Sequence, residues 1–173
     1  MKTLKVLVIE DNERHLQAAK DFFATVSDVE VKFSEDLYQA ATGNDYPNYD
    51  KLKDFDLILS DIYFPYRKDT EEYSSAEFPI GVGVWAYAMI NDIPCILLTD
   101  QNHHDAPVDW ICMLVEKAGL GRITIRDDDG PKMTLMEVFD VIPAFNPEKI
   151  KQWGKAWECF LKERERCLNW KSE

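Results

Sequence analysis

The chain has 173 residues, of which 46% are hydrophobic and 30% are charged, a composition that fits one globular domain and excludes a disordered chain. Its formal net charge is −12, so its surface repels phosphate backbones and we expect no direct binding to nucleic acid. No leader precedes the first apolar run and no stretch is long enough to span a bilayer, which predicts a cytoplasmic protein without a membrane anchor. The four cysteines form no CxxC pair, as is typical of thiols in a reducing compartment.

Short apolar runs rich in Val, Ile and Leu recur along the chain. They are too short for helices and mostly too continuous for half-exposed strands, so we interpret them as strands buried on both faces. These runs are Leu4–Ile9, Val29–Phe33, Leu57–Leu59, Cys95–Leu98 and Arg122–Ile125. Because amphipathic stretches separate the runs, the pattern predicts a parallel sheet with helices on both faces.

The amphipathic stretches predict five helices. The first begins after a cap at Asp11 or Asn12, and the second is short and lies around Glu35–Ala41. Apolar residues at helical spacing mark the other three. They are Trp85, Ala88 and Met89 for the third helix, Val108, Ile111, Cys112 and Val115 for the fourth, and Leu135, Val138, Phe139 and Ile142 for the fifth.

Two segments are long enough to be functional loops, Gly43–Asp54 and Tyr63–Pro79. The second leaves the sheet directly after the third apolar run and carries three aromatic residues among charges. An exposed loop gains nothing from three aromatics, so we expect them to pack on the domain or to form a contact surface. They are Tyr66, Tyr73 and Phe78.

A further helix is predicted at the C-terminus. Asn146, Pro147 and Glu148 form a typical helix start, with a capping Asn, Pro at the first position and an acid in the first turn. An apolar stripe follows, and we expect it to dock on the domain rather than to form a dimer seam. The stripe contains Ile150, Trp153, Trp157, Phe160 and Leu161. We therefore divide the chain into a domain over 1–145 and a helical extension over 146–173 that is not a separate domain.

Acidic and hydroxyl side chains follow three of the predicted strands. Glu10 and Asp11 follow the first strand, Asp61 ends the third, and Thr99 ends the fourth. The carboxyl ends of parallel strands share one edge of the sheet, so these side chains should meet there. Two carboxylates 4 Å apart repel by about 4 kcal/mol at an effective dielectric of 20, and Mg²⁺ relieves that repulsion. The sequence predicts an acidic magnesium site around Asp61.

Three motifs in this order resemble one family. The segments VLVIEDN, DLILSDIYFP and PCILLTD are similar to those of response-regulator receiver domains of two-component signal transduction, the CheY-like superfamily. The resemblance covers roughly residues 4–143. It implies a flavodoxin-like, doubly wound sheet of five parallel strands in the order 2-1-3-4-5 with flanking helices, to which this chain adds a C-terminal helix.

The same resemblance implies a ligand set for Mg²⁺. Carried over to this sequence, Glu10, Asp11 and Asp61 would hold the ion, and the backbone carbonyl of Tyr63 would be a further ligand. Carboxylate and carbonyl oxygens are ligands that Mg²⁺ accepts. No other cofactor is implied.

The resemblance also implies a phosphoryl-transfer site. Asp61 would take a phosphoryl group from a phosphohistidine or from a small phosphodonor, and Thr99 would donate a hydrogen bond to that group. Gly81 or Gly83 stands where the family has a glycine near the start of the third helix. Arg126, at the end of the predicted fifth strand, would supply a positive charge.

Several residues depart from the family pattern. The family has a lysine where this chain has Arg126, whose planar guanidinium is not equivalent to a compact ammonium, and Lys132 is the alternative if the intervening acidic loop folds back. Ile123 stands at the position of the family's aromatic switch residue. Asp100 adds a negative charge next to Thr99. These departures weaken the expectation of phosphorylation but not that of the fold.

Three functions are compatible with these residues. The first is a stand-alone receiver, a phosphorelay component that is phosphorylated at Asp61 by a histidine kinase or phosphotransfer protein and signals through contact with a downstream protein. The second is a pseudo-receiver adaptor that is not phosphorylated. The third is a Mg²⁺-dependent hydrolase, although no second general acid is recognisable. In the first two cases the chain is no enzyme beyond transferring phosphate to and from itself, and it acts as a monomer or homodimer.

Overall fold

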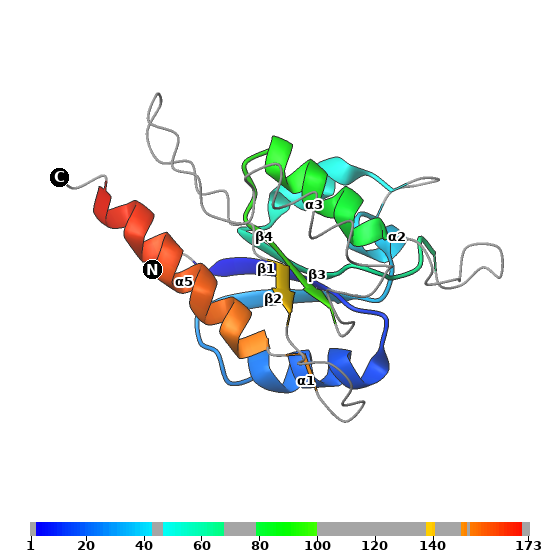
Figure 1. The fold of residues 1–173 in the computed structure, drawn as a ribbon, viewed down its shortest axis with the longest axis horizontal. Coiled ribbons are helices and arrows are strands. Elements are labelled where there is room, and N and C mark those ends of the chain that lie inside the picture. The colour runs from blue at the N-terminus through cyan, green and yellow to red at the C-terminus, as the bar shows by residue number, and fades with distance from the viewer. Residues whose placement is uncertain are drawn as a thin grey trace.

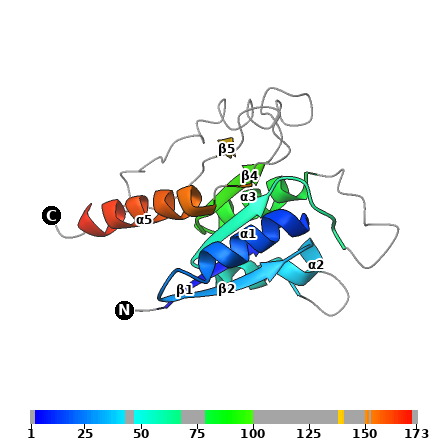
Figure 2. The same ribbon diagram turned by 90° about the horizontal axis from the view of Figure 1, so that it is seen from below.

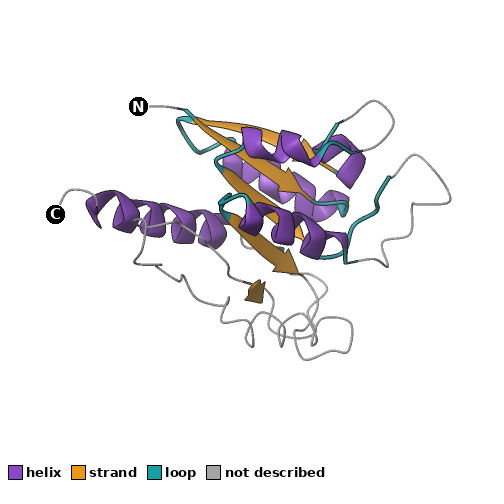
Figure 3. Cartoon of the chain, turned by 90° about the horizontal axis from the view of Figure 1, so that it is seen from above, coloured by secondary structure: helices purple, strands orange, loops and turns teal. Residues whose placement is uncertain are grey.

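The computed structural model describes residues 3–42, 47–67, 79–99, 138–140, 150–151 and 153–170. Its centre is a sheet of parallel strands (Figure 1), which lie in the order β2-β1-β3-β4-β5. The strands are β1 (Leu4–Ile9), β2 (Val29–Ser34), β3 (Leu57–Asp61), β4 (Cys95–Thr99) and β5 (Val138–Asp140). Neighbouring strands pair in parallel, and the long arrows in Figure 3 point the same way. The predicted α/β fold with a parallel sheet is confirmed.

Helices cover both faces of this sheet. One face packs against α2 (Leu37–Ala40), the 3-10 helix η1 (Tyr49–Asp54) and α3 (Ile80–Ile90). The opposite face packs against α1 (Glu13–Phe23) and α5 (Trp153–Trp170). Figure 2 shows that α5, coloured orange to red, starts beside the sheet and runs towards the end at which the N-terminus lies.

The central strands are buried on both faces because apolar residues occupy successive positions along them. Successive side chains of a strand point to opposite faces. In β1, Leu7 and Ile9 join the core beneath α3, whereas Val6 and Val8 join the core beneath α1 and α5. All four side chains are fully buried. The interpretation of the apolar runs as doubly buried strands is therefore confirmed for β1, β3 and β4. It is wrong for β2, whose residues Val29–Phe33 are half-buried or exposed because this strand lies at the edge of the sheet.

The edge strand β5 differs from the sequence prediction. The apolar residues around 135–142 were expected to form a helix, but Val138–Asp140 is a strand that pairs in parallel with β4, with Val138 opposite Leu97. A short apolar run is compatible with a buried strand and with a helix segment. Here the run is a strand because its backbone pairs with β4. The fifth strand predicted at Arg122–Ile125 and the helix predicted from Val108 to Val115 lie outside the described residues.

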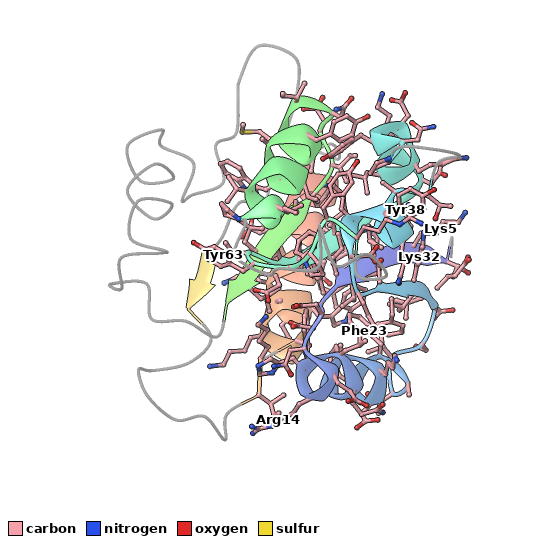
Figure 4. All side chains as sticks on the ribbon, turned by 90° about the vertical axis from the view of Figure 1, so that its right-hand side faces the viewer. Lys5, Arg14, Phe23, Lys32, Tyr38 and Tyr63 are labelled. Carbon is pink, nitrogen blue, oxygen red and sulfur yellow. The ribbon has the colours of Figure 1, made fainter. Side chains whose placement is uncertain are left out.

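The C-terminal helix docks on the domain as predicted, but it starts later. It begins at Trp153 rather than at Pro147, and the two residues described before it, Ile150 and Lys151, are not helical. The aromatic residues of its stripe are buried, with exposed fractions of 2% for Trp153 and 1% for Phe160, whereas Ile150 and Leu161 are half-buried. Trp157 meets Phe23 of α1 edge-on with ring centroids 5.8 Å apart, and Figure 4 shows Phe23 between α1 and the sheet.

The structure describes part of each of the two predicted loops. The first contains η1, which Asn48 caps by accepting a hydrogen bond from the backbone N–H of Asp50. Of the aromatics in the second loop, Tyr66 packs against the core on the α3 face, as expected, whereas Tyr73 and Phe78 lie outside the described residues. Within the described parts of the chain, no helix has both the length and the apolar character needed to cross a membrane.

Candidate functional site

Three carboxyl groups converge at the carboxyl edge of the sheet. Strands β1 and β3 are neighbours, with Ile9 opposite Ser60, so the residues that follow them in the chain emerge side by side. Glu10, Asp11 and Asp61 each present one oxygen, and these oxygens all lie within 4.8 Å of one another. The structure thus brings together the three acidic residues that the sequence predicted to meet, and we call this cluster the acidic pocket.

The third helix is held against this edge at a glycine. The N–H of Gly81 donates a hydrogen bond to the carbonyl of Ile62 over 3.0 Å. A Cβ atom at position 81 would overlap the carbonyl oxygen of Asp61 and lie 2.9 Å from the Cα of Ile62. At Gly83 an added Cβ would meet no atom within 4 Å. Of the two glycines considered from the sequence, the structure requires Gly81.

A lysine that the sequence analysis did not assign lies inside the pocket. The Nζ atom of Lys151 is 2.6 Å from Oε2 of Glu10 and 2.8 Å from Oδ2 of Asp61, and its side chain is fully buried. From the sequence, the cation of this site was expected to be Arg126, with Lys132 as the alternative, and both residues lie outside the described part of the chain. Lys151 was missed because the predicted helix start at Pro147 placed it inside the C-terminal helix. The sequence held one indication of such a residue, since carboxylates buried at a strand end need a nearby cation.

The backbone next to Lys151 is fixed on α1 through His15. The backbone N–H of Lys151 donates to Nδ1 of His15 over 3.4 Å. The indole N–H of Trp153 donates to the carbonyl oxygen of His15 over 3.1 Å. His15 itself is 4% exposed and lies in the first turn of α1, where Asn12 accepts hydrogen bonds from the N–H groups of Arg14 and His15. The cap predicted at Asp11 or Asn12 is therefore Asn12, and it orients the turn that carries His15.

Burial and charge act in opposite directions on the ion pairs. Burial raises the pKa of Glu10 to about 8, with a smaller push from the Asp61 charge, while the ammonium of Lys151 opposes both. Burial alone would lower the pKa of Lys151, but the attraction of Asp61 and Glu10 together raises it above its usual value. Lys151 thus stays charged at neutral pH, and Glu10 takes up a proton more readily than an exposed glutamate.

The remaining oxygens of the two buried acids accept backbone hydrogen bonds. Oδ1 of Asp61 accepts the N–H of Ile62 over 2.7 Å, and Oε1 of Glu10 accepts the N–H of Asn12 over 3.1 Å. Both carboxyl groups are therefore held in one orientation by the main chain that follows their strands.

Two further predicted site residues lie at the same edge. Tyr63 follows Asp61 by two residues and its ring packs on the α3 side of the core (Figure 4). Thr99 is the last residue of β4, one position beyond Leu98, which is opposite Asp61. The metal-ligating role of the Tyr63 carbonyl and the hydrogen-bonding role of Thr99 remain predictions.

The donor set fits a hard divalent cation. Mg²⁺ in proteins takes one or two carboxylates and completes its shell with carbonyls and water, and this pocket offers three carboxyl groups within reach of one ion. Lys151 already contacts one oxygen of Glu10 and one of Asp61. A cation at this edge would therefore share two ligands with the ammonium group.

Solved structures of receiver domains resemble this chain. The response regulator domain of Thermotoga maritima CheB matches with a TM-score of 0.51 and 14% identity, over 97% of this chain and 98% of that chain. The two-component response regulator RcsB, solved in a complex with DNA, matches with a TM-score of 0.50 and 14% identity, over 94% of this chain and 62% of that chain. No protein-family model and no curated protein matches the sequence.

These matches define the class of fold. The chain is an α/β protein with a parallel sheet, and its fold is similar to that of response-regulator receiver domains, as the three motifs predicted. More particularly, it has the CheY-like receiver fold, with three acidic groups and a lysine at the carboxyl edge of the sheet. It spans less than two thirds of the RcsB chain.

Proposed function

We propose that this chain is a receiver-like signalling protein that accepts a phosphoryl group at Asp61 and signals through contact with a downstream protein. The observation that carries the proposal is the buried ammonium of Lys151 beside Asp61. The sequence alone gave little support for phosphorylation, because the guanidinium of Arg126 is a poor substitute for a compact ammonium group. Lys151 supplies a compact cation from the C-terminal segment.

The proposed reaction transfers a phosphoryl group from a histidine kinase or phosphotransfer protein. A carboxylate oxygen of Asp61 attacks phosphorus, the P–N bond of the phosphohistidine breaks, and the electron pair stays with the imidazole as the acyl phosphate forms. Lys151 would move from the Asp61 carboxylate to a phosphoryl oxygen, where its charge offsets the charge that gathers there. Thr99 would donate a hydrogen bond to the same group.

A divalent cation belongs to the proposed site. Mg²⁺ bound to Asp11 and Asp61, with Glu10 and the carbonyl of Tyr63 as further ligands, would offset negative charge on the phosphoryl oxygens. The chain's own groups carry the rest of the chemistry. Asp61 is the nucleophile, the N–H of Ile62 orients its carboxyl group, and Lys151 balances its charge.

The proposal treats the chain as one flavodoxin-like unit with five strands in the order 2-1-3-4-5. The receiver-like part spans 1–145, and the extension over 146–173 belongs to the same unit. This assignment is supported by Lys151 in the pocket and by Trp153 and Phe160 in the core. We expect no contact of this chain with nucleic acid.

Intact-mass spectrometry after incubation with acetyl phosphate and Mg²⁺ tests the proposal. Wild-type protein should gain the mass of one phosphoryl group, and Asp61→Asn should gain none. Asp54→Asn removes an exposed carboxyl group of η1 and should behave like wild type. Equal labelling of the Asp61→Asn and wild-type proteins would contradict the assignment of the acceptor.

A second function is favoured by the burial of the acceptor. Asp61 is only 6% exposed, and its two oxygens contact Ile62 and Lys151. If Lys151 stays bound to Asp61, the ion pair has only a structural role. The chain would then be a pseudo-receiver that binds its partner without being phosphorylated. Absence of any phosphoryl gain in wild type, with the fold intact, would support this function.

A further inference from the structure

His15 links the acidic pocket to the C-terminal helix. Its ring accepts the backbone N–H of Lys151, and its carbonyl accepts the indole N–H of Trp153. One residue of α1 thus holds both ends of the short segment that delivers Lys151 to the pocket. The segment lies 136 residues from His15 in the chain, so these contacts are tertiary and not a local turn.

The position of Lys151 and the docking of α5 depend on the same contacts. Lys151 precedes Trp153, the first residue of α5, by two positions. Trp153 is 2% exposed and belongs to the core on the α1 face. A shift of the Lys151 backbone therefore also displaces the first turn of α5.

We propose that His15 is the positioning residue that holds Lys151 in the pocket, and that it links cation binding in the pocket to the docking of α5. A divalent cation bound to Glu10 and Asp61 places positive charge next to the Lys151 ammonium, and like charges repel. The cation therefore loosens Lys151 and the first turn of α5. Linkage is reciprocal, so firm docking of this segment lowers the affinity of the pocket for the cation. This inference rests on the metal site of the proposed function.

Hydrogen–deuterium exchange of wild-type protein, with Mg²⁺ and with KCl of equal ionic strength, tests the link. Mg²⁺ should speed exchange in peptides that cover Lys151 and the first turns of α5, and leave those of β1 unchanged. In Lys151→Met these peptides should exchange faster from the start, and Mg²⁺ should not speed their exchange further. Lys155→Met removes the same charge from an exposed position of α5 and should respond like wild type.

Variants of His15 separate positioning from simple packing. His15→Ala removes the acceptor for the Lys151 N–H and should raise the affinity for Mg²⁺, measured by calorimetry, by about fivefold or more. His15→Gln keeps a side-chain acceptor and should restore much of the wild-type affinity. These variants also keep the test decisive if Lys151→Met fails to fold, because they leave the ion pairs chemically complete.

The outcomes distinguish this inference from the proposed function. Saturable binding of Mg²⁺ with unchanged exchange in α5 would overturn the link and leave the metal site standing. Equal Mg²⁺ affinities of wild type, His15→Ala and His15→Gln would overturn the positioning role. No binding of Mg²⁺ to wild type or to Lys151→Met would overturn both the metal site and the link.

Discussion

The two faces of the sheet are closed in different ways. On one face, α2 and η1 connect β2 to β3, and α3 connects β3 to β4. All three helices pack against this face of the sheet. On the other face, α1 packs beside α5, which comes from the far end of the described chain. The first face is assembled from local crossovers, whereas the second closes only when the C-terminal helix docks.

This difference matters because the acidic pocket depends on both faces. The α3 face contributes Gly81, which lets the helix approach the backbone at Asp61. The α1 face contributes Lys151, which pairs with Glu10 and Asp61. We therefore expect changes at Lys151 to affect the pocket and the closure of the α1 face together, and changes at Gly81 to act on the backbone of the pocket.

The largest effect is expected at Lys151. Lys151→Met leaves two buried acids without their cation, which should lower the free energy of unfolding by about 3–5 kcal/mol. Urea unfolding should show this loss, and Mg²⁺ should restore part of it. Lys155→Met, at an exposed position, is the control and should unfold near the wild-type midpoint. Equal midpoints for Lys151→Met and wild type would show that the buried ion pairs do not stabilise the fold.

The next effect tests the α3 face. Gly81→Ala places a methyl group against the backbone of Asp61 and Ile62, so we expect a loss of about 1–3 kcal/mol or more from the resulting shift of α3. Gly83→Ala enters open space in the same helix and should be neutral or stabilise by up to about 1 kcal/mol. Thermal unfolding of the two variants measures the contrast. A stable Gly81→Ala protein would show that α3 needs no close approach to β3.

A more gradual effect, spread over several pH units, is expected in the pH dependence of stability without Mg²⁺. The pKa of Glu10 is raised from 4.5 to about 8 by burial, so between these values the folded state binds more protons than the unfolded state. Stability from this group is therefore full below the unfolded pKa and falls as the pH rises towards 8, by at most about 1.4 kcal/mol per pH unit.

Urea unfolding at pH 5 and pH 8 measures this slope, and Glu10→Gln should remove its contribution. A Glu10→Gln protein with the full wild-type slope would show that another group causes it.

The smallest effect is expected for an exposed ion pair on the α3 face. Lys53 Nζ lies 2.7 Å from Oδ1 of Asp50, a separation close to those of Lys151, but both side chains are exposed and water screens their attraction. Lys53→Met should therefore leave the urea midpoint within error of wild type. A loss comparable to that of Lys151→Met would show that burial is not what makes the Lys151 pairs important.

Most of the sheet could be predicted from the sequence. The runs at Leu4–Ile9, Leu57–Leu59 and Cys95–Leu98 are strands because continuous apolar residues suit positions that are buried on both faces. The convergence of Glu10, Asp11 and Asp61 could also be predicted, since parallel strands place their carboxyl ends at one edge. Local pattern and the geometry of a parallel sheet were sufficient for these features.

The tertiary structure alone decided the features that depend on which distant segments meet. Val138–Asp140 has apolar spacing that fits a helix, and it is a strand because the edge of β4 was open to pair with it. Gly81 and Gly83 are equivalent in sequence, and only the approach of α3 to Asp61 distinguishes them. Lys151 pairs with an acid 141 residues away. No local pattern records such a contact, because its energy arises only when the folded chain removes both charges from water.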